Sequence, residues 1–209
     1  MANDNAQIEA WRNEFGDSYI GRNPASIENI RRRTNAFAEI FLHLRGAKPT
    51  SILEVGCNIG INLRALKNLT SAKLHALEPN PNAREVLTQD NVLEEGRLKE
   101  GMGTSIPFDD ESMDLVFTSG VLIHVPPADL DQVYKEIHRV SGKYILCAEY
   151  FSQKPETIPY RGRDDLLFKQ DFGGLWLDTF PDLEVMATGF FWKRTTGLDD
   201  LTWWLFRKP

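Results

Sequence analysis

The stretch from Thr50 to Asn62, T-S-I-L-E-V-G-C-N-I-G-I-N, constrains the fold of this chain more than any other segment. The apolar run at 52–55 predicts a buried parallel strand, and Gly56 and Gly60 follow it closely. A helical pattern begins directly afterwards, with apolar residues at 61, 63, 66 and 69. A strand, a glycine-containing turn and a helix in this order are typical of a nucleotide site in an α/β sheet. We expect Gly56 to permit the sharp turn and Gly60 to let the backbone approach a ligand closely.

The composition is that of a soluble globular chain, since 42% of the 209 residues are hydrophobic and 26% are charged. There are 24 Lys and Arg residues against 30 Asp and Glu residues, and the net charge of −6 argues against a broad nucleic-acid surface. The chain has no run of about 18 apolar residues, and its first ten residues lack the features of a secretory signal. We therefore expect no membrane partner and a cytoplasmic location. Cys57 and Cys147 are expected to be buried free thiols.

Apolar periodicity predicts an alternation of helices and strands along the rest of the chain. Ser26 is expected to cap a helix whose apolar face runs from Ile27 to Leu44 and which ends at Gly46. The two last strands, roughly 183–192 and 200–207, predict an antiparallel hairpin. The fold class is therefore α/β, a Rossmann-like, doubly wound and mostly parallel sheet with a C-terminal antiparallel β-hairpin at its edge. Further strands are predicted at 73–77, near 97–100, at 113–118 and at 144–150, with helices at about 82–93 and 128–140.

No linker, repeat or low-complexity tract divides the chain, so we expect a single domain over residues 1–209. Residues 1–45 are expected to form an N-terminal helical lid or cap, with a short helix over 6–15 followed by a loop. Residues 50–150 are expected to form the cofactor-binding core. Residues 151–209 would then supply an acceptor loop and the C-terminal hairpin.

The acidic residues around the glycine turn indicate which ligand it serves. Glu78 lies 18 residues after Gly60 at the end of a predicted strand, where an acid can hold ribose hydroxyls. A nicotinamide site has a second glycine where this chain has Asn58, although Asn also tolerates a left-handed backbone. Glu54 is unsuited to an anionic pyrophosphate and suits a ligand that carries a cation. These features disfavour a Rossmann oxidoreductase and favour a cationic nucleoside.

Four motifs in order resemble those of class I S-adenosylmethionine-dependent methyltransferases: L-E-V-G-C-N-I-G, L-E-P-N, M-D-L-V-F-T-S-G-V-L-I-H-V and Y-I-L-C-A-E-Y-F. The resemblance covers roughly residues 50–150. Outside it, G-R-N at 21–23, Y-R-G-R-D-D at 160–165, F-K-Q-D-F-G-G at 168–174 and D-D-L-T-W-W-L at 199–205 are similar to a narrower group. That group is the pseudaminic acid biosynthesis-associated methylases, small proteins encoded near surface-sugar pathways.

The resemblance implies S-adenosyl-L-methionine as cofactor and S-adenosyl-L-homocysteine as product. Glu54 would lie near the methionine ammonium or reach it through water, and Glu78 would accept both ribose hydroxyls. Families of this class often have an Asp near the adenine amino group, where this chain has Thr104 or Ser105. The residues expected at the cofactor are Glu54, Gly56, Cys57, Asn58, Gly60, Glu78, Pro79, Asn80, Thr104, Ser105, Thr118, Ser119 and Gly120.

Methyl transfer is an in-line displacement that needs positioning and a deprotonated nucleophile. His124 or Glu149 could act as the base, although His124 could equally be a structural histidine. The four histidines show no metal-ligand spacing, so no metal is expected. Aromatic and basic residues expected at the carboxyl ends of the strands predict a pocket for an anion. The substrate candidates are Tyr19, Arg22, Tyr150, Tyr160, Arg161, Arg163 and Lys169.

The predicted function is methyl transfer to a small acceptor, in the class of a sugar, a sugar nucleotide or a compound bearing a carboxylate or amine. A protein that binds the cofactor without transferring a methyl group is the alternative.

Some of the arginines have a structural interpretation. The run Arg31-Arg32-Arg33 is expected to be a solvated helix face, and Arg161 could pair with Asp164 or Asp165 instead of binding an anion. The sequence is compatible with a monomer or a homodimer, and the narrower resemblance implies a role in surface polysaccharide biosynthesis.

Overall fold

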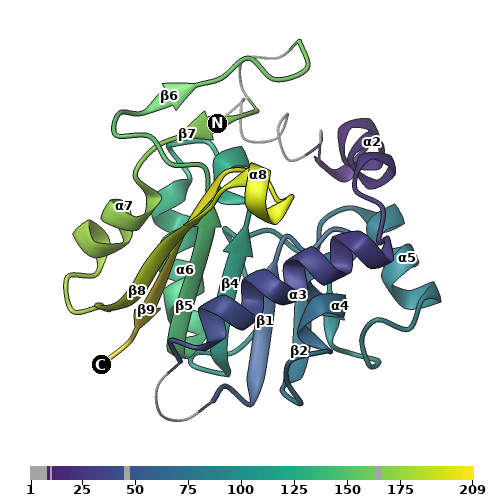
Figure 1. Ribbon diagram of the computed structural model, residues 1–209, viewed down its shortest axis with the longest axis horizontal. Helices are drawn as coiled ribbons and strands as arrows, with labels where there is room; N and C mark the ends of the chain where they lie inside the picture. The colour runs from purple at the N-terminus through teal and green to yellow at the C-terminus, as the bar shows by residue number, and fades with distance from the viewer. Residues whose placement is uncertain (1–8, 10, 45–47, 163–165) are drawn as a thin grey trace.

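The computed structural model describes residues 9, 11–44, 48–162 and 166–209. Its main sheet has the strand order β3-β2-β1-β4-β5-β9-β8 (Figure 1). Strands β1 to β5 pair in parallel, whereas β9 is antiparallel to both β5 and β8. The expected mostly parallel sheet with an antiparallel hairpin at its edge is confirmed. The strands are β1 Ser51–Val55, β2 Lys73–Leu77, β3 Leu98–Lys99, β4 Met113–Ser119, β5 Ser141–Glu149, β8 Glu184–Phe191 and β9 Leu201–Arg207.

Helices cover both faces of the sheet. One apolar core lies between the sheet and the helices α3 and α4, and a second lies between the sheet and α6 and α7 (Figure 1). Trp203 belongs to the first core and Trp204 packs against the second, as the alternation of side chains along β9 requires. The helices are α2 Glu14–Arg22, α3 Ile27–Phe41, α4 Ile61–Leu66, α5 Pro81–Gln89, the 3₁₀ turn η1 Leu122–His124, α6 Leu130–Val140, α7 Phe172–Thr179 and α8 Lys193–Thr196.

The N-terminal segment is helical further along the chain than expected. Helix α2 takes the place of the loop predicted after residue 15. Asn80, the N-cap residue of α5, attaches this N-terminal segment to the rest of the domain through its side-chain amide. The Asn80 side-chain amide donates to the carbonyl of Trp11 at 3.2 Å and to the carboxylate of Asp17 at 2.9 Å. The cap of α3 is confirmed, since Ser26 Oγ accepts the amide of Asn29 at 3.2 Å. The helix end predicted at Gly46 lies outside the described residues.

The segment between β5 and β8 contains a two-stranded ribbon and a helix, neither of which has a clear sequence signal. Strands β6 (Glu156–Thr157) and β7 (Phe168–Lys169) pair as a separate antiparallel ribbon. Helix α7 begins at an Asp171 cap that accepts the amide of Gly174 at 2.8 Å. Two glycines in its first turn weaken the helical pattern, yet Trp176 is fully buried and anchors the helix.

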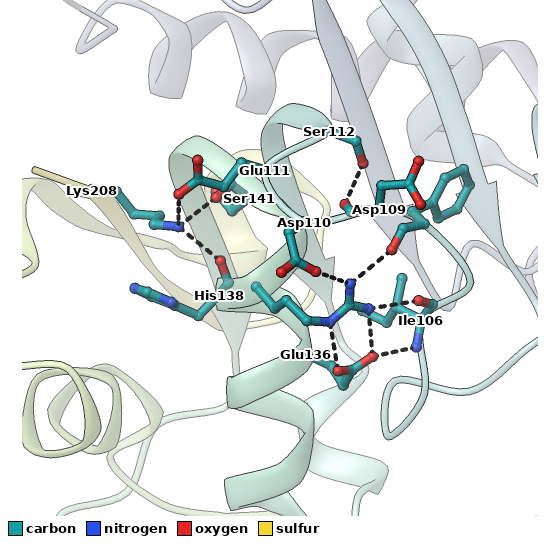
Figure 2. Close-up of polar contacts among 11 residues, drawn as sticks. Ile106, Asp109, Asp110, Glu111, Ser112, Glu136, His138, Ser141 and Lys208 are labelled. Carbon is teal, nitrogen blue, oxygen red and sulfur yellow. Dashed lines mark hydrogen bonds and ion pairs between the residues drawn. The ribbon is translucent and has the colours of Figure 1, made fainter.

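Arg139 of α6 holds the loop between β3 and β4. Figure 2 shows Ile106, Asp110 and Glu136, which contact it. The Arg139 guanidinium donates to the carbonyls of Ile106 and Phe108, both at 2.9 Å, and to Asp110 at 2.7 Å. Glu136 accepts the Ile106 amide at 2.8 Å and pairs with Arg139. These contacts fix the loop that follows β3 at the edge of the sheet.

None of the described helices is both long enough and apolar enough to cross a bilayer.

Candidate functional site

The turn after β1 has the left-handed backbone that its sequence predicts. Gly56, Asn58 and Gly60 have φ values of 74°, 48° and 72°. The Gly56 amide donates to the carbonyl of Leu77 at 2.8 Å, which binds the turn to the end of β2. A Cβ at Gly56 would lie 2.8 Å from a methyl of Val121, so this position excludes larger residues.

Gly60, expected to let the backbone approach a ligand, is enclosed by packed side chains in this structure. A Cβ on Gly60 would overlap Leu87 of α5 and lie 3.3 Å from Leu63 and from Val92. The glycine therefore allows α4 and α5 to pack closely. It does not line the cavity beside the turn.

A cavity of about 160 Å³ opens at the carboxyl ends of β1, β2 and β4. Most residues predicted at the cofactor border it, together with parts of the N-terminal segment. The predicted residues that line it are Glu54, Gly56, Cys57, Asn58, Glu78, Pro79, Asn80, Ser119 and Gly120.

Glu78 is buried, and two backbone amides fix its carboxylate. One oxygen accepts the Asn58 amide at 2.7 Å and the other accepts the Asn80 amide at 2.9 Å. Burial raises the pKa of this carboxyl, while the two amides act against that rise. Each carboxylate oxygen keeps a lone pair for a further donor, so the group can receive two neighbouring hydroxyls.

Glu54 is also buried but is incompletely satisfied. One of its oxygens accepts the Asn62 side-chain amide at 2.7 Å. Its Oε2 has no hydrogen-bond partner in the part of the chain that the structure describes. Burial raises the pKa of Glu54 to about 8. A buried carboxylate oxygen that lacks a donor is a strong site for a cation.

Arg33 was expected on a solvated face, but it lines both this cavity and a second one. Its neighbours Arg31 and Arg32 pair with Glu28, whereas the Arg33 guanidinium has no ion pair or hydrogen bond to another described residue. Burial lowers its pKa, and the charge of Glu54 is one of the influences that oppose this. Position 33 follows Ile30 by three residues, which places it on the inward face of α3; helical spacing could therefore have indicated it.

The second cavity has a volume of about 480 Å³ and adjoins the first. Tyr19, Asn23, Arg33, Asn62, Ser119, Gly120 and His124 line both. Thr118, predicted at the cofactor, lines only the second cavity. Five of the predicted substrate residues line it, namely Tyr19, Arg22, Tyr150, Tyr160 and Arg161.

Two predicted substrate residues are not at the wall of this cavity. Lys169 does not line it, and its ammonium lies over the Tyr150 ring at 5.3 Å. Arg163 lies outside the described residues, as do Asp164 and Asp165.

His124 lies where the two cavities meet. Its Nδ1 donates to the carbonyl of Leu166 at 2.5 Å, because a carbonyl can only accept. This contact makes Nε2 the unprotonated nitrogen of the neutral ring. Burial lowers the pKa of His124 to about 4, so the ring stays neutral at physiological pH.

Sequence and structure comparisons identify the domain that holds these cavities. Residues 53–145 match the model of a methyltransferase domain. The sterol 24-C-methyltransferase erg6 of Schizosaccharomyces pombe is 27% identical over 135 residues, which are 62% of this chain and 34% of that protein. The methyltransferase GfsG of Streptomyces halstedii is 28% identical over 123 residues, 56% of this chain and 43% of that protein. The chain thus spans less than half the length of these two relatives.

Solved structures agree on the fold. A S-adenosylmethionine-dependent methyltransferase of Leishmania major has a TM-score of 0.71 at 16% identity, covering 97% of this chain and 82% of that chain. The glycopeptide N-methyltransferase MtfA complexed with sinefungin has a TM-score of 0.62 at 14% identity, covering 84% of this chain and 94% of that one. This chain has the same α/β fold as these methyltransferases.

The cofactor that this methyltransferase domain implies is S-adenosyl-L-methionine, and the residues present fit it. The unpartnered oxygen of Glu54 suits an ammonium group, and the two fixed oxygens of Glu78 suit a pair of hydroxyls. Among the residues that the structure describes, no group of three or more His, Cys, Asp and Glu side chains could hold a metal ion.

Two further site expectations for the methyltransferase domain need correction. Thr104 and Ser105 do not line the first cavity, and an antiparallel bridge between Met102 and Ser105 closes a tight turn at this point. Gly101, Met102 and Gly103 line the cavity instead. A glycine pair directly after a predicted strand was the available signal for these residues.

Glu149, predicted as a base, lines neither cavity. It is fully buried and accepts the backbone amides of Val121 at 3.2 Å and Ile123 at 3.4 Å. Burial raises its pKa to about 7. Glu149 therefore positions the segment that carries His124 rather than facing an acceptor.

Proposed function

We propose that this protein transfers a methyl group from S-adenosyl-L-methionine to a small anionic acceptor. The observation that carries the proposal is the pairing of two cavities. One presents the carboxylates of Glu54 and Glu78, and the other presents arginine and tyrosine side chains. A cationic nucleoside fits the first cavity and an anion fits the second.

In the first cavity, Glu78 would bind the ribose hydroxyls and Pro79 would flank the adenine. The amino-acid end of the cofactor is a zwitterion. Glu54 Oε2 would hold its ammonium, and the Arg33 guanidinium would hold its carboxylate. Glu54 and Arg33 influence each other electrostatically but form no ion pair, which supports a zwitterion between them.

Ser119 and Gly120 border both cavities and would face the methyl group of a bound cofactor. The cofactor, when bound, would supply a sulfonium methyl carbon to the acceptor's nucleophile, with S-adenosyl-L-homocysteine as the leaving group. Where the nucleophile is a hydroxyl, its proton passes to Nε2 of His124. With a pKa of about 4, the His124 ring is unprotonated throughout the neutral range, as a proton acceptor must be.

The acceptor is a sugar, a sugar nucleotide or another compound bearing a carboxylate or amine. Tyr19, Tyr150 and Tyr160 offer hydroxyls in the acceptor cavity, and Arg22 and Arg161 offer positive charge. Apolar side chains such as Phe37, Phe117 and Phe191 line the same cavity, but its arginines favour an anion over the sterol named for the Schizosaccharomyces pombe relative. The resemblance to methylases encoded near surface-sugar pathways makes anionic sugars of polysaccharide biosynthesis the first class to assay.

The test is to incubate the protein with a small-molecule extract and S-adenosyl-L-methionine labelled in its methyl group, and to analyse the products by mass spectrometry. The proposal expects an acceptor heavier by one labelled methyl and an equal amount of S-adenosyl-L-homocysteine. Binding of the cofactor with no labelled product in extracts supplemented with anionic sugars would favour the non-catalytic alternative.

A further inference from the structure

Arg22 lies at the C-terminal end of α2, on the wall of the acceptor cavity. Its guanidinium stands over the rings of Phe15 at 5.5 Å and Tyr19 at 5.2 Å. Contacts of this kind between a guanidinium and aromatic rings are attractive and restrain the side chain. The side chain is therefore held in place before any ligand arrives.

The charge of Arg22 is not balanced within the described part of the chain. Its Nη2 is buried and has no hydrogen-bond partner there. Asp199 is the carboxylate on the wall of this cavity, but it already accepts from Lys193 at 2.9 Å and interacts with the Tyr150 hydroxyl. A buried guanidinium donor without an acceptor is costly, and an oxyanion removes that cost.

The other cations of the cavity are placed differently. Arg161 is exposed and lies over the Tyr160 ring at 5.6 Å. Lys193 is paired with Asp199. Arg33 borders the cofactor cavity as well, where the proposed cofactor carboxylate uses it. Arg22 lines the acceptor cavity but not the cofactor cavity. Its buried Nη2 has no hydrogen-bond partner among the described residues.

We propose that Arg22 binds the anionic group of the acceptor, a carboxylate or a phosphate, and so sets which acceptors the enzyme takes. The inference rests on the proposed function. It selects Arg22 over Arg161, since the exposed guanidinium of Arg161 is already solvated and gains less from an anion.

The position of Arg22 also relates the anion to the reacting atoms. Arg22 and His124 both line the acceptor cavity. Burial is the main cause of the low pKa of His124, and the charge of Arg22 lowers it further. An anion on Arg22 offsets that charge and makes His124 more basic when the acceptor is bound. The preferred acceptors therefore carry their anionic group close to the atom that is methylated.

The experiment measures anion binding to the complex with S-adenosyl-L-homocysteine by calorimetry, at constant ionic strength. The probes are inorganic phosphate, acetate and the neutral acetamide. Wild-type protein is expected to bind one of the two anions saturably and not acetamide, and the stronger anion identifies phosphate or carboxylate as the group recognised. Arg22→Gln is expected to weaken this binding by about tenfold or more, and Arg22→Lys by less.

The matched control is Arg31→Gln, which removes the same charge from an exposed position outside the acceptor cavity and is expected to bind the anion as wild type does. Unchanged anion binding in Arg22→Gln, loss in Arg161→Gln alone, or no saturable anion binding to the loaded complex would each overturn the inference. Failure of S-adenosyl-L-homocysteine to bind the wild-type protein would instead refute the proposed function. Its affinity for each variant shows that the variant is folded.

Discussion

The two carboxylates of the cofactor cavity are both buried, but the chain satisfies them unequally. Glu78 receives two backbone amides, whereas Glu54 receives one side-chain amide and keeps an oxygen without a partner among the described residues. Glu78 is therefore prepared for neutral hydroxyl donors. Glu54 can accept a further hydrogen bond from a positively charged donor. In the free protein, burial favours the protonated form of its carboxyl.

Cofactor binding should therefore release a proton from Glu54. With a pKa of about 8, the carboxyl is mostly protonated at pH 6.5 in the free protein, and an ammonium partner requires the ionised form. Calorimetry of S-adenosyl-L-homocysteine binding at pH 6.5, in two buffers of different ionisation enthalpy, is expected to show release of close to one proton. The Glu54→Gln variant is expected to bind the ligand without this proton release. An identical binding enthalpy in both buffers for the wild type would contradict this role.

The proposed contact of Arg33 with the cofactor carboxylate predicts a ligand-specific loss. Arg33→Gln should weaken binding of S-adenosyl-L-homocysteine by about tenfold or more, the scale of a charge-assisted hydrogen bond. Binding of 5′-methylthioadenosine, which lacks the amino-acid moiety, should stay unchanged. Equal losses for the two ligands would mean that Arg33 acts on the fold of the site rather than on the carboxylate.

At the scale of elements, the cofactor cavity depends on how closely α4 and α5 pack beside the glycine turn. Gly60 lies at this junction with a left-handed backbone and is enclosed by Leu63, Leu87 and Val92. The acceptor side depends on η1 and the residues before it, which Glu149 holds through backbone amides. Gly60 and Glu149 line neither cavity, but they stabilise backbone segments that do: the glycine turn and the segment around η1.

Gly60→Ala should destabilise the protein more than the same change at another left-handed glycine. Backbone strain of about 1–2 kcal/mol adds to an overpacking cost of about 1–3 kcal/mol at Gly60. Gly96 has a φ of 78° but open space around a Cβ, so Gly96→Ala isolates the strain. Urea unfolding measures both free energies. Equal losses would show that the α4–α5 contact relaxes without cost.

Arg139 joins the β3–β4 loop to α6 through two backbone carbonyls and two acids (Figure 2). Arg139→Ala is expected to lower the free energy of unfolding by about 1–3 kcal/mol, because it leaves polar groups of the loop without donors. Lys135→Ala, which removes an exposed pair with Asp131 on the same helix, should cost less than about 0.5 kcal/mol. Faster hydrogen exchange at the Ile106 amide would locate the effect, and protection unchanged from wild type would argue against it.

For the whole molecule, the sequence predicts the sheet better than the site. Strand β2 coincides with its prediction, because buried parallel strands are short apolar runs with clear limits. Helix α7 was not predicted because the two glycines in its first turn obscure the apolar periodicity. Its stability comes from the burial of Trp176, which the local sequence pattern does not show. Motif positions cannot tell which glycine borders a cavity, and of the two glycines of the turn only Gly56 does. Arg33 was assigned to the solvated face because it belongs to a run of charges, although its spacing from Ile30 indicates the inward face of α3.

The most direct test of the central claim is the affinity of S-adenosyl-L-homocysteine for the Glu78→Ala variant, measured by calorimetry. Loss of two ribose contacts to a charged carboxylate should weaken binding by about 1.5–3 kcal/mol, or roughly ten- to a hundredfold. Glu85→Ala, which removes an exposed glutamate from α5, is the control and should bind as wild type does. Wild-type affinity in a folded Glu78→Ala variant would contradict the assignment of this cavity to the cofactor.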